Sequence, residues 1–202
     1  MSLPKQLTEV LFAAHSTMAQ KLINQRMRHL FLPFLLLVTL GATAQKTDAK
    51  AQKDEAKALV RKGYEKIQNG NFENAIVDFN HALEKDPECI DAYLRRAFCY
   101  SATNDYKNAV EDYNKVIKLN PDLETAYVSR GSAKNKLKLF KEALVDFNKA
   151  LQLQPDDYQA YNNRGWAKKG LGDDDGACQD WRFSKKKGNQ EAKIILDNTH
   201  CK

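Results

Sequence analysis

The chain has 202 residues, of which 29% are charged and 43% hydrophobic, a balance that predicts a soluble fold of one or two ordinary domains. Five prolines and nine glycines are too few for a linker-rich or disordered chain. The formal net charge of +6 predicts no nucleic-acid partner, because the basic residues alternate with acidic ones, as they do on solvated helix faces.

The N-terminal part of the chain contains an apolar run that is typical of an export signal. A basic pair at 28–29 precedes the run at 30–40, and the small residues ATA at 42–44 have the spacing of a signal-peptidase site. The run is shorter than the about 20 residues that span a bilayer. An uncleaved membrane anchor or an ordinary apolar helix is the alternative interpretation.

These features predict how the N-terminal part is organised. We expect a mis-called N-terminal extension at 1–26, a signal peptide at 27–44 and a flexible linker at 45–53; a longer signal is the alternative to the extension. No cysteine follows the cleavage point, which disfavours a lipoprotein anchor. Without residues 1–44 the chain keeps 28 basic and 25 acidic residues, a net charge of +3.

The remainder repeats itself every 34 residues. The phrases DFNHALEKDP (78–87), DYNKVIKLNP (112–121) and DFNKALQLQP (146–155) stand at this spacing. Small residues recur at 63, 97, 131 and 165 and again at 75, 109, 143 and 177, and aromatic residues recur at 79, 113, 147 and 181. Such a formula suits paired helices that approach closely at the small residues, with an aromatic ring beside them and a proline after the second helix.

This pattern resembles the tetratricopeptide repeat over residues 54–188. The third unit carries the resemblance in the following residues: Tyr127, Gly131, Phe140, Ala143, Phe147, Ala150 and Pro155. The resemblance implies an all-α solenoid of four units, 56–89, 90–123, 124–157 and 158–188. The expected helices are 54–69, 72–85, 90–103, 106–119, 124–137, 140–153, 158–171 and 174–187.

The fourth unit departs from the formula in a way that predicts the end of the stack. Lys185 replaces an apolar residue, and Asn189 replaces the terminal proline. A terminal unit needs a polar outer face. We expect Asn189 to cap a further helix at 190–198 within a capping segment 189–202, and its apolar residues Ala192, Ile194, Ile195 and Leu196 to cover the last pair.

One charged pairing also recurs, at a separation of 16 residues. The pairs are Lys62/Asp78, Arg96/Asp112, Arg130/Asp146 and Arg164/Asp180. They would bridge the two helices of a unit, or the acid would meet the next unit's arginine. A solvated stripe is the alternative.

Four cysteines remain after the signal. Cys178 falls on an inward position of the last pair, and Cys201 follows the predicted capping helix, so we expect a disulfide that ties this helix down. Cys89 and Cys99 lie too far apart along one helix to bond and are expected to be free.

No catalytic, cofactor or metal motif accompanies the repeats. His81 falls on an outward position, and the spacing of the cysteines fits no zinc site. The acidic stretch GDDDG at 172–176 lacks the spacing of a calcium loop and fits a turn that caps a helix. We therefore expect no enzyme activity, no cofactor and no metal.

The resemblance also implies a binding surface, because the first helices of such repeats line a concave face. Carried over by position, the expected peptide-binding groove consists of Val60, Tyr64, Ile67, Leu94, Arg95, Phe98, Ser101, Val128, Ser129, Ser132, Asn135, Asn162, Asn163, Trp166 and Lys169. Tyr64, Phe98 and Trp166 occupy equivalent places, and such rings would hold apolar side chains while amides hold a peptide backbone. Packing between neighbouring helices is the alternative role of these rings.

One subclass of the family is not expected here. Cochaperone members grip a C-terminal carboxylate with Lys, Asn and Arg, and the matching positions hold Val60, Tyr64, Arg95, Thr125 and Ser129, of which only Arg95 has a suitable charge.

The sequence thus predicts a non-enzymatic, protein-binding adaptor or scaffold. The ending GACQDW at 176–181 and the signal ending ATAQ resemble exported repeat proteins of Bacteroidetes-type bacteria, which implies a periplasmic location; secretion and membrane anchoring are the alternatives. The second hypothesis is a self-associating solenoid, in which the groove accepts residues 46–56 of another copy.

Overall fold

The computed structural model describes residues 47–199 and 201, and the chain divides into two compact units, 1–51 and 52–202. In the first unit, residues 47–51 are helical. The predicted extension and signal peptide lie outside the described residues, and the second unit contains all the repeats.

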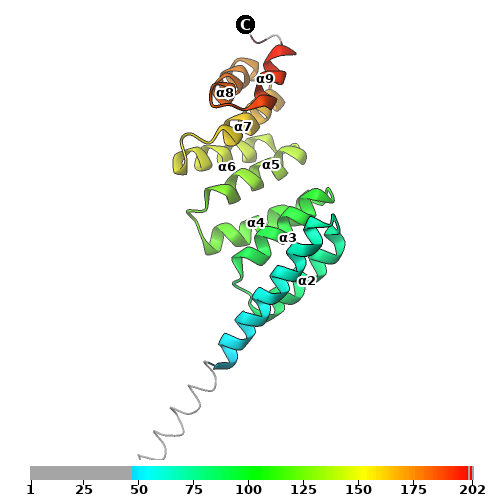
Figure 1. The fold of residues 1–202 in the computed structure, drawn as a ribbon. Helices are drawn as coiled ribbons and strands as arrows, with labels where there is room; N and C mark the ends of the chain where they lie inside the picture. Colours follow the sequence, from blue (N-terminus) through cyan, green and yellow to red (C-terminus); the bar gives the residue numbers. More distant parts are fainter. Residues whose placement is uncertain (1–46, 200, 202) are drawn as a thin grey trace, which may run out of the picture. The chain divides into compact units, whose positions relative to one another are not determined.

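Helices and turns account for the secondary structure of residues 47–199 (Figure 1). A first helix covers residues 47–68, and the others are α2 (Phe72–Lys85), α3 (Ile90–Ala102), α4 (Tyr106–Leu119), α5 (Glu124–Lys136), α6 (Phe140–Leu153), α7 (Tyr158–Gly170), α8 (Asp174–Lys186) and α9 (Gln190–Asp197). From α2 onward, consecutive helices contact each other, and α5 also contacts α7. The predicted all-α solenoid with a capping helix is confirmed, whereas the predicted flexible linker is wrong for residues 47–53, which are helical.

The turn inside each helix pair uses one residue with positive φ. Gly70 (72°), Asn104 (63°) and Gly172 (82°) are residue types that favour this region, and Lys138 (60°) takes the same place in the third pair. The turns of the first, second and fourth pairs are therefore visible in the sequence, but the third is not.

The second helix of three pairs begins with a side-chain cap. Asn71, Asp105 and Asp173 each accept a hydrogen bond from the backbone N–H three residues on, whereas Leu139 supplies no such bond to α6. The acidic stretch 172–176 thus has the capping role that its sequence predicts.

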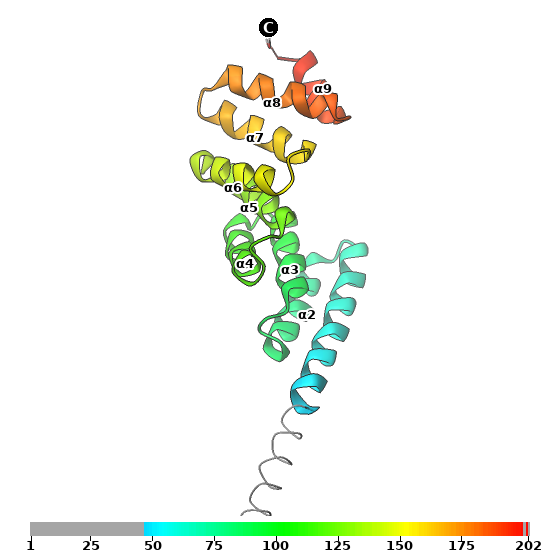
Figure 2. The same ribbon diagram turned by 90° about the vertical axis from the view of Figure 1, so that its left-hand side faces the viewer.

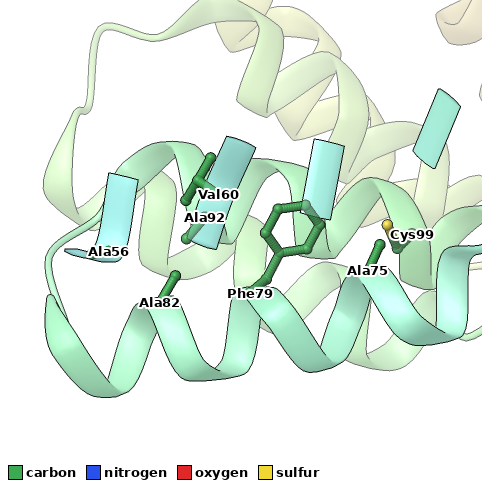
Figure 3. Packing of buried hydrophobic residues seen from close by; sticks show 7 residues of the cluster. All are labelled: Ala56, Val60, Ala75, Phe79, Ala82, Ala92 and Cys99. Atoms are coloured by element: carbon green, nitrogen blue, oxygen red, sulfur yellow. The ribbon is translucent and has the colours of Figure 1, made fainter. Parts of the chain in front are cut away.

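Glycine permits the close helix crossing in three of the four pairs. A Cβ atom built on Gly63, Gly131 or Gly165 would lie 2.7, 2.8 or 2.5 Å from the ring of the aromatic residue that is 16 positions further on. Figure 3 shows one of these rings, Phe79, in a cluster with alanines of α2 and with Val60 of the first helix. Val60 is only 6% exposed, so its predicted place in the groove is wrong, and it belongs to the core.

The recurring charged pairs bridge the two helices of each unit. Arg130 donates from Nε and Nη2 to the two carboxylate oxygens of Asp146, at 3.0 and 2.5 Å, and Lys134 lies 2.8 Å from the same carboxylate. Arg130 also donates to Asn114 of the preceding unit at 2.7 Å. One guanidinium therefore joins three helices, and the same arrangement recurs around Arg96 and Arg164.

Burial disfavours the charged form of a carboxylate, whereas an arginine partner favours it. Asp78, Asp112, Asp146 and Asp180 are all less than 5% exposed. Burial raises the pKa of Asp112, although Arg96 lowers it. In this unit Tyr100 stands at the position where the third and fourth units have Lys134 and Lys168, which pair with the corresponding carboxylates.

The capping helix lies against α8 (Figure 2). Ala192 and Ile195 are buried in a cluster with Ala177 and Trp181, but Ile194 is 61% exposed and does not cover the last pair. A disulfide joins Cys178 to Cys201 with their Cα atoms 5.5 Å apart, while Cys89 and Cys99 are free.

Candidate peptide-binding groove

Two neighbouring pockets, with volumes of about 500 and 590 Å³, form an open groove over α5 and α7. Four residues line both pockets and mark the place where they meet: Ser132, Lys136, Asn163 and Glu191. Most of the lining residues therefore belong to the third and fourth units; the second unit contributes Ser101, Tyr106 and Tyr113, and α9 contributes Glu191.

The groove contains part of the predicted set. Nine of the predicted residues line the two pockets: Ser101, Val128, Ser129, Ser132, Asn135, Asn162, Asn163, Trp166 and Lys169. Six line neither pocket: Val60, Tyr64, Ile67, Leu94, Arg95 and Phe98. These two pockets thus contain the C-terminal part of the predicted surface together with Ser101 of the second unit.

In the N-terminal half, the exposed rings contact other side chains. Arg95 lies over the ring of Tyr64, 4.3 Å from its centroid, and forms an ion pair with Asp91 at 2.8 Å. Phe98 meets Phe72 edge to face, at 6.1 Å between centroids. These contacts agree with the alternative role of packing between helices, although Tyr64 and Phe98 remain 41% and 50% exposed.

Ser132 opens the groove in the third unit. It stands 34 residues after Phe98 and 34 before Trp166, at the place where the other units have a ring. A hydroxymethyl group fills far less space than an aromatic side chain. We call the resulting hollow, bounded by Ser132, Asn163, Lys136 and Glu191, the Ser132 recess.

Amide groups form the floor of the groove. Asn135 donates from Nδ2 to the backbone carbonyl of Asn163 at 2.8 Å, and Asn163 donates from Nδ2 to the hydroxyl of Ser132 at 3.1 Å. Asn162, which is 2% exposed, donates from Nδ2 to Oε2 of Glu191 at 2.9 Å. The carbonyl oxygens of Asn135 and Asn162 are buried and accept no hydrogen bond within the described part of the chain.

An apolar wall closes one end of the second pocket. Trp166, 41% exposed, meets the buried Trp181 edge to face at 5.2 Å between centroids. Phe140 lies so close to Gly170 that a Cβ atom there would be 2.6 Å from the ring. The wall can therefore contact an apolar side chain while the floor offers polar groups.

Other lining residues were absent from the predicted set: Tyr106, Tyr113, Ala133, Lys136, Phe140, Tyr158, Gln159, Gly170, Asn189 and Glu191. Burial raises the pKa of the Tyr113 phenol, although the neighbouring hydroxyls of Ser129 and Ser101 lower it. The aromatic residues Tyr106 and Phe140 start second helices at the 34-residue period, which is a signal that the sequence offered. Glu191 lies outside the period and has no such signal.

Within residues 47–199 and 201, no three His, Cys, Asp or Glu side chains gather where they could hold a metal ion. Over the same residues, none of the helices combines the length and apolarity needed to cross a bilayer.

Comparison with protein families identifies the repeats. Tetratricopeptide repeat models match residues 56–89, 90–123 and 124–157. The chain belongs to the tetratricopeptide repeat family, and the matched units have the bounds that its sequence predicts. No curated protein sequence matches the chain.

Solved structures with this fold come from several organisms. The first repeat domain of Spaghetti (RPAP3), solved with the HSP90 peptide SRMEEVD, is 27% identical over 59% of this chain and 95% of that one, with a TM-score of 0.58. MamA from Desulfovibrio magneticus is 21% identical over 71% and 82%, with a TM-score of 0.67. The Arabidopsis OM64 domain is 23% identical over 58% and 98%, with a TM-score of 0.56. The last two likenesses concern the fold alone.

Proposed function

We propose that this protein is a non-enzymatic adaptor that binds an extended segment of another protein in the groove over α5 and α7. The observation that carries the proposal is the continuity of the two pockets at the Ser132 recess. A polar floor beside an apolar wall suits a peptide, because amides can pair with its backbone while rings contact its side chains.

The likeness to RPAP3 supports the kind of ligand, since that structure contains a peptide. This likeness does not imply that the protein binds the same peptide. Of the five positions that grip a terminal carboxylate in cochaperones, Val60 is buried here and Arg95 is already paired with Asp91.

Self-association is supported less well. The second hypothesis needs residues 46–56 as an extended insert, but residues 47–56 are helical and Ala56 is fully buried. We expect light scattering to give the molar mass of one chain at every concentration, with or without Ser132→Phe. A mass that rises with concentration and that Ser132→Phe lowers would support self-association.

We also propose that the protein works in the periplasm. The support is the apolar run at 30–40 with its ATA site and the resemblance to exported repeat proteins. Sequencing the N-terminus of the protein from fractionated cells tests this: we expect Gln45 as the first residue, in the periplasmic fraction. An intact N-terminus in the cytoplasmic fraction would contradict it.

Peptide binding is tested by probing the full chain with an array of 12-residue peptides of random sequence. Ser132→Phe introduces a ring at the recess, and Val145→Phe introduces the same ring on α6 at a residue that is 68% exposed and lines neither pocket. We expect Ser132→Phe to abolish the peptide signals and Val145→Phe to keep them. Signals that survive both substitutions would place binding elsewhere.

A further inference from the structure

The Ser132 recess holds one charged group that is fixed in place. The carboxylate of Glu191 lines both pockets and accepts a hydrogen bond from Asn162 at 2.9 Å. Asn162 is 2% exposed, so its amide has little freedom, and Asn189 caps α9 beside Glu191. None of the ion pairs identified among residues 47–199 includes Glu191.

The amides around the recess have fixed orientations. Asn135 and Asn162 use their NH₂ groups on Asn163 and Glu191, which fixes the orientation of both amides. Their carbonyl oxygens are buried and accept no hydrogen bond from the residues that the structure describes. A positive charge beside Glu191 would be stabilised by its carboxylate.

The two lysines of the groove are less well placed to set its preference. Lys169 forms an ion pair with Asp174 at 3.1 Å. Lys136 is exposed and forms no ion pair with residues 47–199, so its ammonium group sits on a flexible stem that can turn to solvent. A preorganised charge contributes more to specificity than a mobile one, because less freedom is lost on binding.

We propose that the Ser132 recess receives a lysine or arginine side chain of the bound segment, with Glu191 as its counter-ion and Asn162 as the residue that positions Glu191. This inference rests on the proposed function, and it adds the chemistry of the ligand. The partner would carry this basic residue next to an apolar residue that contacts Trp166.

Four pools of 12-residue peptides, random except for a central Lys, Arg, Gln or Glu, test the inference against the full chain. We expect the Lys and Arg pools to bind about tenfold more tightly than the Gln pool, which is the effect of one charge-assisted hydrogen bond in an open site. Equal binding of all pools, or a preference for Glu, overturns the inference but leaves the proposed function standing. No binding of any pool overturns both.

Two substitutions at Glu191 and one matched control complete the test. Glu191→Gln should remove the preference for basic peptides, and Glu191→Lys should reverse it toward Glu. Glu142→Gln is the control, because Glu142 is also an exposed acid in the first turn of a helix but lines neither pocket. A Glu191→Gln protein that melts like the Glu142→Gln protein and still prefers Lys would overturn the role of Glu191.

Discussion

The first two repeats (56–123) and the last two (124–188) share one framework but present different surfaces. In the first two, Tyr64 and Phe98 stand over the first helices and contact Arg95 and Phe72. In the last two, Ser132 leaves a recess in front of Trp166, where the two pockets meet. The difference teaches that a small side chain at one position of the repeat, Ser132, can open a recess while the packing formula stays constant.

The framework itself also differs between the two halves. Asp146 is held by Arg130 and Lys134, whose side chains are only 17% and 16% exposed. Asp78, its equivalent in the first repeat, is held by Lys66 at 2.6 Å and by Lys62 at 3.6 Å, and Lys62 is 63% exposed. A buried acid therefore has a more rigid pair of partners in the third repeat than in the first.

The largest expected effect comes from breaking this pairing. Asp146→Ala should lower the free energy of unfolding by about 3 kcal/mol, because it leaves two largely buried cations without a carboxylate partner. Asp78→Ala should lower it by about 1 kcal/mol, since Lys62 can turn to water. Urea titration followed by circular dichroism measures both. Equal losses would show that the arginine bridge adds nothing to what lysines provide.

The disulfide is the next test, because only the C-terminal end of the stack has one in the described chain. Reduction should destabilise the last repeat and α9 by about 3 kcal/mol, as expected for a loop of this length. A Cys178→Ser/Cys201→Ser protein should be equally destabilised and indifferent to reductant. If reductant instead affects a Cys89→Ser/Cys99→Ser protein less than the wild type, the free cysteines are responsible.

Glu124 at the start of α5 and Asp157 at the cap of α7 form a carboxyl pair that should make the contact between these helices depend on pH. Burial and the neighbouring Asp157 raise the pKa of Glu124 to about 7. Because the folded protein binds this proton more tightly than the unfolded chain, the contribution to stability is complete below pH 4.5 and is lost as pH rises through 7.

The size of this loss should be about 1 kcal/mol, since the pair is partly exposed and screened by solvent. Melting temperatures between pH 4 and 8 measure it, and Glu124→Gln should remove the dependence in this range. Glu88→Gln, at an exposed glutamate two residues before α3 begins, is the matched control in the first half of the stack. A pH profile that Glu124→Gln does not change would contradict the assignment.

The last prediction is that a peptide bound by a related repeat domain does not bind to this protein. The peptide SRMEEVD, present in the RPAP3 structure, should not bind to this protein at any concentration that leaves it soluble. Three of the five matching positions lie in the first two repeats, where Val60 is buried and Tyr64 lies under Arg95. Fluorescence polarisation with a labelled peptide checks this, and saturable binding would show that the first repeats also recognise ligands.

The sequence predicted the framework well because the framework is periodic. Gly63, Gly131 and Gly165 recur with their aromatic partners, and Asn71, Asp105 and Asp173 mark helix starts at the same spacing. Lys138 shows the limit of this signal. Lysine has no preference for positive φ, so the sequence gives no sign of the turn at this residue.

The site was predicted only in part, for reasons that are local. The position of each residue within its repeat correctly predicted that Ser132, Asn163 and Trp166 lie on one surface. It did not predict where on that surface the pockets lie. Val60 was misplaced because a residue at a groove position in one unit can be covered by α2 and α3 in another. Glu191 was missed because it reaches the groove from α9, beyond the last repeat.

Trp166 provides the most direct test of the central claim that the groove over α5 and α7 binds a peptide. The chain contains two tryptophans, and Trp181→Phe installs the ring that the first and third repeats use at the same place, so that Trp166 alone reports on the groove. Titration with the tightest peptide from the arrays should change the emission of Trp166 to saturation, and Ser132→Phe should abolish that change. Emission that stays constant while polarisation shows the same peptide to be bound would contradict the account.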